Sequence, residues 1–425
     1  IFDKDIDSGL LNYLIKRLQI TNKDNIQSGG RIHNFKNFIR FPEIVFDKKN
    51  TRKKPFIHPL LKNANSVSEV ILQRDILLSF PYHSFDTIID ILREAAIAPD
   101  VVSIKITCYR LAEDSNVINA LTNAVRNGKS VTVILELRAR FDEEANLEWK
   151  KILEDAGVKV FTGLPGMKVH AKLCLIKKKI HKHTVLYGFI STGNANEKTG
   201  SVYADHCLLT SDKKIMHDSN RIFNFLENPK NLESLKTCTT LWISPINMRK
   251  HFESLINKEI KHAKENKPAS IYLKLNSLSD EGLIAKLYEA ALAGVEMKMI
   301  IRGICCMYTE NKKFKTKVKA ISIVDEYLEH ARVLISHNGG NEKYFISSAD
   351  WMVRNLDHRI EVCCPIFDKS IQKELKEILE IQLSDNTKAR ILDNDLSNKY
   401  AKASAGEKKV RSQIQIYNLL QKKKY

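Results

Sequence analysis

Two short stretches of the sequence place a histidine and a cation two residues apart. KVHAKLCLI carries His170 and Lys172, and EHARVLI carries His330 and Arg332, each in an apolar run typical of a strand. Residues i and i+2 of a strand point to the same face, so each histidine and its cation are expected to share one space. Nearby cations lower the pKa of an imidazole and leave it neutral and nucleophilic at physiological pH. The pattern indicates phosphoryl chemistry, in which an imidazole attacks phosphorus while Lys172 and Arg332 hold the non-bridging oxygens.

The two stretches belong to an internal repeat. Residues 189–212 (FISTGNANEKTGSVYADHCLLTSD) align without a gap with residues 345–368 (FISSADWMVRNLDHRIEVCCPIFD), at an offset of 156 residues. The alignment pairs Asp205 with Glu361, which we interpret as groups that orient the facing histidines or as caps of strand ends. One histidine in a strand more often packs than reacts, whereas two at matching positions favour chemistry.

The rest of the repeat predicts the elements that position these side chains. Residues 120–141 and 286–304 each indicate an amphipathic helix, a glycine suited to a helix C-cap, and an apolar strand followed by an arginine, which is Arg302 in the second copy. Residues 77–96 and 241–260 each indicate a short apolar run, a serine and a proline, then a helix. We therefore expect two α/β domains of common ancestry, each ordered strand, helix, strand, helix, strand, histidine strand, hairpin and strand.

Composition limits the kind of protein. The 425 residues include 68 Lys and Arg against 50 Asp and Glu, a net charge of +18, which favours an anionic partner without naming it. No apolar stretch approaches the roughly 20 residues of a membrane span, and no signal peptide opens the chain, so a cytoplasmic location is expected. The eight cysteines show no CxxC spacing and suggest buried reduced thiols. Because the first residue is Ile, we expect a fragment of a longer protein.

The paired motifs resemble the phospholipase D superfamily, whose signature is His-x-Lys followed after four residues by Asp. This sequence has Lys177 at the aspartate position and Arg332 in place of the second lysine. These departures, together with several long strings, resemble the first family of polyphosphate kinases. The strings include ELRARFDEEAN (136–146), GMKVHAKLCLI (166–176), STGNANEKTGSVYADHCLLT (191–210) and SSADWMVRN (347–355).

The resemblance implies two tandem phospholipase-D-like α/β domains related by internal duplication. The first catalytic domain is expected at residues 55–237 and the second at residues 238–425. Residues 1–54 are expected to be the end of a helical head domain.

The resemblance also implies roles for individual residues. His170 would be the nucleophile that becomes phosphohistidine, and His330 would act as proton donor or acceptor at the other end of the displaced bond. Tyr203 and Arg302, with His330, would contact ATP. Without the resemblance, we would favour the interpretation of Tyr203 as an aromatic residue packed on the sheet.

Arg110 and Arg140 match the family positions associated with the magnesium site. A guanidinium group has no lone pair to give a metal ion. We therefore interpret both arginines as clamps on the phosphate oxygens that Mg²⁺ also binds.

The implied activity is reversible transfer of the terminal phosphoryl group of ATP to inorganic polyphosphate through the phosphohistidine, with Mg²⁺ as cofactor. ATP, ADP and polyphosphate are the expected partners, and nucleic acid is not expected. The resemblance allows peripheral membrane association and implies a homo-oligomer, a dimer or tetramer, for the full-length protein. Two alternatives stay open, a phospholipase-D-like phosphodiesterase and a non-catalytic module that binds polyanions.

Overall fold

The computed structural model describes residues 2–21, 26–30, 52–109, 115–137, 143–164, 166–181, 183–229, 232–404 and 406–423. The chain forms two compact units, Ile1–Arg52 and Lys53–Tyr425, and each is described by itself. The smaller unit contains β1 (Phe2–Asp3), α1 (Ser8–Arg17) and β2 (Ser28–Gly29), with β1 parallel to β2. The Asp7 carboxylate caps α1 by accepting the N–H of Leu10 at 2.8 Å.

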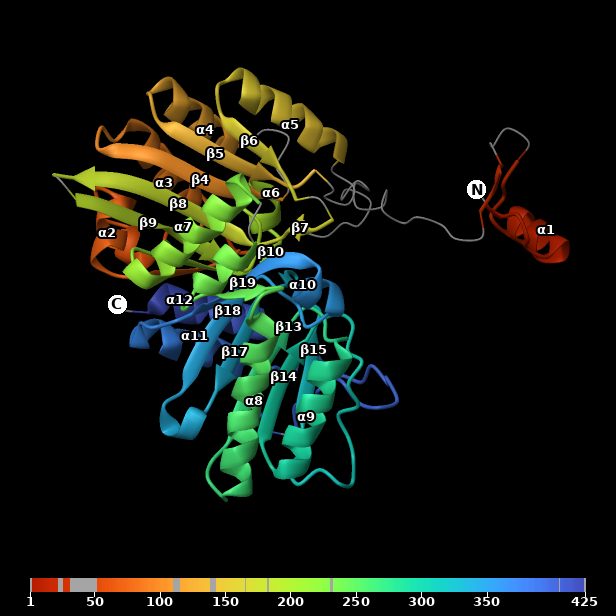
Figure 1. The fold of residues 1–425 in the computed structure, drawn as a ribbon. Helices are drawn as coiled ribbons and strands as arrows, with labels where there is room; N and C mark the ends of the chain where they lie inside the picture. The colour runs from red at the N-terminus through yellow and green to blue at the C-terminus, as the bar shows by residue number, and fades with distance from the viewer. Residues whose placement is uncertain are drawn as a thin grey trace. The chain divides into compact units, whose positions relative to one another are not determined.

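The larger unit is built on two mixed β-sheets (Figure 1). The first half, which carries the first sheet, contains η3 (Pro59–Leu61), α2 (Val67–Gln73), β3 (Ile76–Ser79), α3 (Asp86–Ile97), β4 (Val101–Cys108), α4 (Asn116–Arg126), β5 (Ser130–Leu135), α5 (Glu143–Asp155), β6 (Lys159–Thr162), β7 (Lys168–Val169), β8 (Lys172–Ile180), β9 (His183–Ser191), α6 (Glu197–Gly200), β10 (Tyr203–Ala204), β11 (His206–Thr210), α7 (Lys213–Glu227) and η4 (Leu232–Thr237).

The second half follows without a long linker. It contains β12 (Trp242–Ser244), α8 (Met248–Lys264), β13 (Ser270–Leu275), α9 (Glu281–Ala293), β14 (Glu296–Ile301), β15 (Lys319–Ile323), β16 (Leu328–Glu329), β17 (Arg332–Ser336), η5 (Asn338–Gly340), β18 (Lys343–Ser347), α10 (Val353–Asp357), β19 (Arg359–Pro365), α11 (Lys369–Leu383), β20 (Ala389–Ile391) and α12 (Ser412–Lys422).

The two sheets repeat one topology. The first runs β3-β11-β9-β8-β4-β5-β6, and the second runs β12-β19-β18-β17-β13-β14-β15 with β20 added at its edge. In both, three neighbouring strands are parallel and the strands on the histidine side are antiparallel. The expected fold class, tandem phospholipase-D-like α/β domains that arose by duplication, is confirmed. The domain boundaries expected at residues 54 and 237 stay predictions.

One aspartate in each repeat starts an equivalent helix. The Asp212 carboxylate accepts the N–H of Ile215 at 3.0 Å to cap α7, and the Asp368 carboxylate accepts the N–H of Ile371 at 3.1 Å to cap α11. Such a cap satisfies an N–H group that the first turn of a helix leaves unpaired. The aligned aspartates therefore explain why both helices begin at the same place in the repeat.

The hydrophobic core joins the two halves. One cluster contains apolar residues of both sheets together with α7 and α11, for example Leu173, Phe223, Val333 and Leu375. A second cluster lies under α3 and α4 in the first half, and a third lies under α8 and α9 in the second. Because the first cluster is continuous across the sheets, it fixes the two histidine strands relative to each other.

The state of the cysteines agrees with the expectation from the sequence. All eight cysteines are free, and six of them are buried, as expected for reduced thiols. Among the described helices, none has the length and apolar character needed to cross a bilayer.

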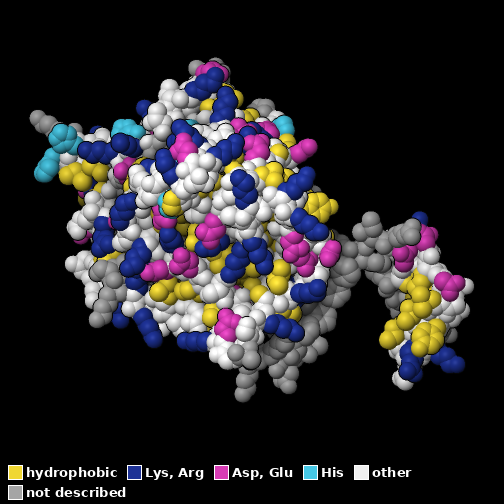
Figure 2. Space-filling model, turned by 90° about the horizontal axis from the view of Figure 1, so that it is seen from below, with side chains coloured by type: hydrophobic (Ala, Val, Ile, Leu, Met, Phe, Trp, Pro, Cys, Tyr) yellow, Lys and Arg dark blue, Asp and Glu magenta, His cyan; other side chains and the backbone are white. Residues whose placement is uncertain are grey.

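On the face of the larger unit seen in Figure 2, Lys and Arg side chains lie interspersed with Asp and Glu. The net positive charge is therefore not gathered into one band on that face.

Candidate active site

Short strands of the two halves pair with each other at the histidines. β7 of the first half pairs in parallel with β19 of the second, and β10 of the first half pairs in parallel with β16 of the second. The N–H groups of His170 and Ala171 both donate to the carbonyl oxygen of Ile360, each at 2.9 Å. Those of His330 and Ala331 donate to the carbonyl oxygen of Ala204. Each histidine is thus held by backbone of the opposite half.

The pairing of β7 with the opposite half corrects the expectation of one continuous histidine strand. The apolar run around His170 is divided into β7 and β8, and His170 lies between them. β7 belongs to the second sheet and β8 to the first, because the N–H groups of His170 and Ala171 turn to Ile360. The cation therefore approaches the histidine from the next strand, where Lys172 Nζ donates to the carbonyl oxygen of His170.

A buried carboxylate of the second half orients His170. The Nδ1 atom of His170 lies 2.8 Å and 2.9 Å from the two carboxylate oxygens of Glu361. Glu361 is fully buried and also accepts from the Ser348 hydroxyl and, at 2.6 Å, from the Asn355 amide. Because an ionised carboxylate can only accept, Nδ1 carries the proton and Nε2 carries the lone pair.

The second histidine has the reciprocal arrangement. The Nδ1 atom of His330 lies 2.9 Å and 2.8 Å from the oxygens of Asp205, which also accepts from the Thr192 hydroxyl at 2.6 Å. Asp205 and Glu361 therefore orient the facing histidines, one of the two interpretations drawn from the repeat. In each pair the carboxylate is buried, while 13% of the His170 side chain and 16% of the His330 side chain remain exposed.

Both histidines are neutral at physiological pH, but the main cause differs from the expected one. Burial lowers the pKa of His170 to about 4, against the opposing effect of Glu361, and Lys172 contributes a smaller lowering. Burial also lowers the pKa of His330, followed by the charge of Arg332. Loss of hydration, more than the neighbouring cations, therefore keeps these imidazoles uncharged.

The two carboxylates stay ionised. Burial alone would raise the pKa of Glu361, but His170 and Lys172 hold it below its usual value. The pKa of Asp205 is likewise held well below its usual range, because His330 and Arg332 outweigh the effect of burial. Each pair thus consists of a carboxylate and a neutral imidazole whose Nδ1–H is fixed.

The cations of the two halves differ in their partners. Arg332 donates from Nη2 to Asp350 at 2.8 Å, and its Nη1 lies 3.0 Å from Nε2 of His330. The position equivalent to Asp350 in the first half is Asn194. Within the described chain Lys172 has no ion pair, and burial lowers its pKa to about 7. The lone pair of His330 is therefore occupied by an arginine, whereas the His170 ring has hydrogen bonds only to Glu361 among the described residues.

Two further residues of the expected site lie beside His330. The ring of Tyr203 meets the ring of His330 edge to face, with centroids 5.1 Å apart. Arg302 donates to the side-chain oxygen of Asn276, whose backbone and amide both donate to Asp350. Burial and the charge of Arg332 lower the pKa of Arg302. The structure thus brings His170, Lys172, His330, Arg332, Tyr203 and Arg302 into one site, whereas Arg110 and Arg140 lie outside the described residues.

Sequence reasoning missed two residues at this site. Arg359 begins β19 and is close enough to contribute to the lowered pKa of both His170 and Lys172. The repeat aligns Arg359 with Tyr203, so the signal was present in the sequence. Tyr109, at the end of β4, meets the ring of His170 edge to face at 5.0 Å and lies 5.4 Å from Lys172 Nζ. No sequence pattern pointed to Tyr109.

The described residues contain no group of three or more His, Cys, Asp or Glu side chains that could hold a metal ion. Asp205 and Glu361, the acids at the histidines, are each engaged by an imidazole. The acids beside the two histidines therefore orient imidazoles and do not form a preformed three-ligand cluster for a metal ion.

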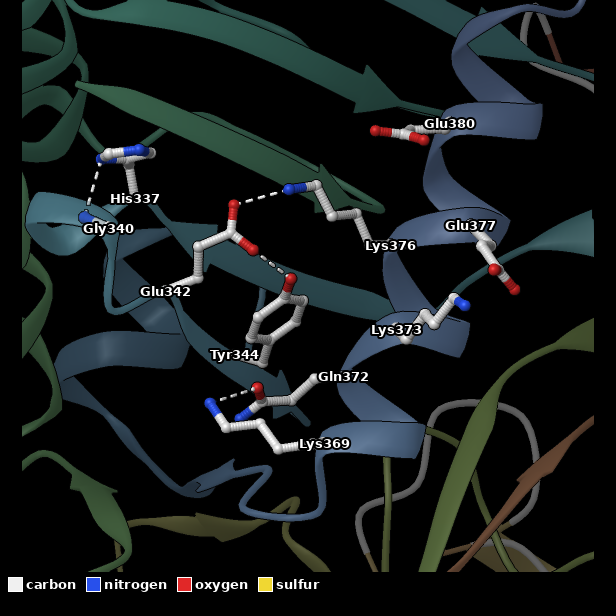
Figure 3. A pocket seen from close by; sticks show the side chains of 10 residues that line it. All are labelled: His337, Gly340, Glu342, Tyr344, Lys369, Gln372, Lys373, Lys376, Glu377 and Glu380. Carbon is white, nitrogen blue, oxygen red and sulfur yellow. Dashed lines mark hydrogen bonds and ion pairs between the residues drawn. The ribbon is translucent and has the colours of Figure 1, made fainter. Parts of the chain in front are cut away.

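A separate hollow lies between α11 and the turn that joins β17 to β18, together with Tyr344 of β18 (Figure 3). Within it, Lys376 donates to Glu342 at 2.6 Å, and the Tyr344 hydroxyl also donates to Glu342. None of the expected site residues lines it. We therefore place the candidate active site at the paired histidines.

The fold and the site define a class of protein, the two-domain phospholipase-D-like α/β proteins, here with one histidine and carboxylate pair built reciprocally across the halves. The family model "Polyphosphate kinase C-terminal domain 1" matches residues 66–232, and "Polyphosphate kinase C-terminal domain 2" matches residues 241–413. Together they cover well over half of the chain. The chain belongs to the polyphosphate kinase family, as the sequence resemblance indicated.

Individual relatives and solved structures agree with this family assignment. The chain is 45% identical over 421 residues to a polyphosphate kinase of Vibrio vulnificus (strain CMCP6), a match that covers 99% of this chain and 60% of the relative. The crystal structure of a polyphosphate kinase from Porphyromonas gingivalis superposes with a TM-score of 0.84 at 37% identity, covering 99% of this chain and 64% of that one. A phosphatidylserine synthase structure from Haemophilus influenzae shares the fold, with a TM-score of 0.51 at 11% identity, over 82% of this chain and 93% of that one.

Proposed function

We propose that this chain transfers the terminal phosphoryl group of ATP reversibly to inorganic polyphosphate through a phosphohistidine on His170. The chain spans about 60% of the length of its Vibrio vulnificus relative, so the activity is proposed and does not follow from family membership alone. One observation carries the assignment of the nucleophile. His170 has Nδ1–H fixed by Glu361 and no described partner on Nε2, whereas Nε2 of His330 faces Arg332 at 3.0 Å.

The proposed first step is displacement at the γ-phosphorus. The lone pair on Nε2 of His170 forms the N–P bond, and the bond between the γ-phosphorus and the bridging oxygen breaks, so that ADP leaves with the electron pair. Glu361 offsets the positive charge that the ring gains while Nδ1 keeps its proton. In the second step a terminal oxygen of polyphosphate attacks phosphorus and the N–P bond breaks, which restores neutral His170.

The remaining site residues are proposed to bind and orient the substrates. Lys172 and Arg332 hold the phosphate oxygens, and Tyr203, Arg302 and His330 contact the nucleotide. Since Arg332 is already paired with Asp350, Lys172 is the cation with more capacity to bind a new anion. His330 is proposed to accept or give a proton through Nε2 at the other end of the displaced bond, once the substrate phosphate draws Arg332 away from that nitrogen.

Mg²⁺ is proposed to enter with ATP as the ion of the nucleotide. Phosphate-bound Mg²⁺ keeps several waters and needs few protein ligands. Such an ion would offset charge on the phosphate oxygens. Arg110 and Arg140, outside the described residues, are proposed to bind the same oxygens. We further propose a cytoplasmic location, a homo-oligomer, peripheral membrane association and no nucleic acid partner. The proposed domain limits are residues 1–54, 55–237 and 238–425.

The test is phosphoenzyme formation with γ-³²P-ATP and Mg²⁺. Wild-type chain should gain acid-labile, alkali-stable label that ADP discharges as ATP. His170→Ala should gain none, and the exposed control His217→Ala should label as wild type does. Label that water discharges without ADP would instead indicate a phosphodiesterase. A wild-type chain that binds polyphosphate but takes no label would reject the proposal in favour of a binding module.

A further inference from the structure

The C-terminal helix α12 lies outside the repeated elements, and the second family match ends at residue 413, near its start. Its buried residues Ile416 and Leu420 pack in a small apolar cluster with Tyr82 and Ala204 of the first half and Tyr327 of the second. In Figure 1, α12 lies at the level where the two halves meet. This helix therefore covers the place where β10 crosses to β16.

The buried side chain of Gln413, at the start of α12, binds the backbone that leads into β16. Its amide oxygen accepts the N–H of Tyr327 at 2.9 Å, and its amide nitrogen donates to the carbonyl oxygen of Tyr327 at 2.8 Å. The side chain thus takes the place that a neighbouring strand would have at Tyr327. The same nitrogen lies 2.8 Å from Oε1 of Glu329.

Glu329 immediately precedes His330 and is held by three side chains. Besides Gln413, it accepts from Lys274 Nζ at 2.6 Å and from the Gln382 amide at 2.8 Å. Only 1% of the Glu329 side chain and 3% of the Lys274 side chain are exposed. A buried carboxylate needs such donors, since an unpaired one is costly in a low-dielectric interior.

The first half lacks this arrangement. Val169 stands before His170 where Glu329 stands before His330, and its N–H donates to the buried Glu136 at 2.9 Å. Among the described contacts of α12, none reaches Val169 or His170. Among the described residues, the helix therefore contacts the segment just before His330 and makes no described contact with the segment around His170.

We propose that Gln413 is a positioning residue that, from α12, fixes Tyr327 to Glu329 and thereby sets His330 against Asp205. The effect of this positioning on phosphotransfer rests on the proposed function. His330 then depends on a helix outside the repeat, whereas His170 depends only on contacts within the repeated halves.

The test uses ¹⁵N-histidine-labelled chain and the low-field signals of the two hydrogen-bonded Nδ1–H groups. His170→Ala and His330→Ala assign the signals. Gln413→Leu removes the amide, and Gln413→Glu keeps its size but loses the donor to Glu329. We expect both variants to shift or lose the His330 signal and to leave the His170 signal unchanged. Gln421→Leu, the same change at an exposed position of α12, should change neither.

Each other outcome overturns the proposal. Unchanged His330 signals in both Gln413 variants would show that Gln413 does not position the ring. Loss of both histidine signals together would assign Gln413 to the stability of the whole fold. The spectra need no turnover, so they remain decisive even if wild type takes no label and the proposed function fails. If wild type is active, transfer to polyphosphate should fall on the order of 10²-fold in Gln413→Leu.

Discussion

The two histidines differ in what lies at their Nε2 atoms, although the repeat makes their positions equivalent. Arg332, tied to Asp350, donates toward Nε2 of His330, and the first half replaces this pair by Lys172 and Asn194. The replacement removes a carboxylate and leaves a cation that burial brings to a pKa of about 7. Because the repeats differ at these two aligned positions, Nε2 of His170 has no described hydrogen-bond partner, whereas Nε2 of His330 accepts from Arg332.

Glu361→Gln should reduce phosphoenzyme formation by about 10²- to 10⁴-fold, as expected when a histidine loses the carboxylate that fixes its tautomer. The three donors that now meet the carboxylate, from His170, Ser348 and Asn355, cannot all be accepted by an amide. The His170 proton would then move to Nε2 and block attack. The measurement is the rate of labelling from γ-³²P-ATP.

Glu380→Gln, on the exposed face of α11, is the matched control for this charge change and should label at the wild-type rate. A Glu361→Gln chain that labels within twofold of wild type would show that the carboxylate does not set the tautomer.

At the scale of elements, the sequence was informative where signals are local. Hydrophobic periodicity and the repeat predicted the alternation of strands and helices up to the histidine strands. The predicted order lacked α5 and the helices α7 and α11, although the aligned aspartates Asp212 and Asp368 cap the last two. The pairing of β7 with β19 and of β10 with β16, across the two halves, was not predicted. It pairs residues far apart in the chain, such as Val169 with Ile360, and no local period encodes such a contact. For the same reason Tyr109 was missed at the site.

The turns after β9 and β18 give a prediction of their own. Gly193 and Ala349 occupy equivalent places, and each N–H donates to a serine hydroxyl two residues back, at 3.1 Å and 3.0 Å. A Cβ on Gly193 would lie 2.8 Å from Cβ of Asp205 and even closer to its carboxylate. Gly193→Ala should therefore displace Asp205 from His330 and lower the free energy of unfolding by about 1–3 kcal/mol.

Urea unfolding followed by tryptophan fluorescence measures this change, since all three tryptophans, Trp149, Trp242 and Trp351, lie in the larger unit. Gly282→Ala, at an exposed position with its nearest neighbour 3.5 Å away, is the control. Equal unfolding free energies for Gly193→Ala and wild type would mean that the turn moves aside freely.

At the scale of the whole molecule, neither half completes a site alone. Each histidine takes its carboxylate and its backbone acceptor from the other half, so the core that joins the sheets also fixes the chemistry. The sequence revealed the duplication and six of the site residues that the structure brings together. It could not reveal their reciprocal pairing, because equivalence in a repeat does not say whether partners lie within one copy or across two.

Buried histidines should make the larger unit sensitive to acid. His58, His83 and His206 lie together, with the His58 and His83 rings 4.8 Å apart and Ser79 bonded to both His83 and His206. Burial lowers the pKa of His58 and of His206 to about 3, and that of His83 well below its usual value. Below about pH 6.5 these histidines bind protons in the unfolded chain but not in the folded chain. The free energy of unfolding therefore decreases as the pH is lowered.

Each such histidine should lower the free energy of unfolding by up to about 1.4 kcal/mol per pH unit between pH 6.5 and 5. His170 and His330 add an effect of the same sign, whereas Asp350, with a pKa lowered to about 2, responds only in stronger acid. Urea unfolding at pH 7, 6 and 5 should show a shallower pH slope for His83→Gln than for wild type. His217→Gln, at an exposed position of α7, should keep the wild-type slope. Identical slopes in His83→Gln and wild type would mean that His83 takes up its proton in the folded chain, which would require the cluster to open to water without unfolding.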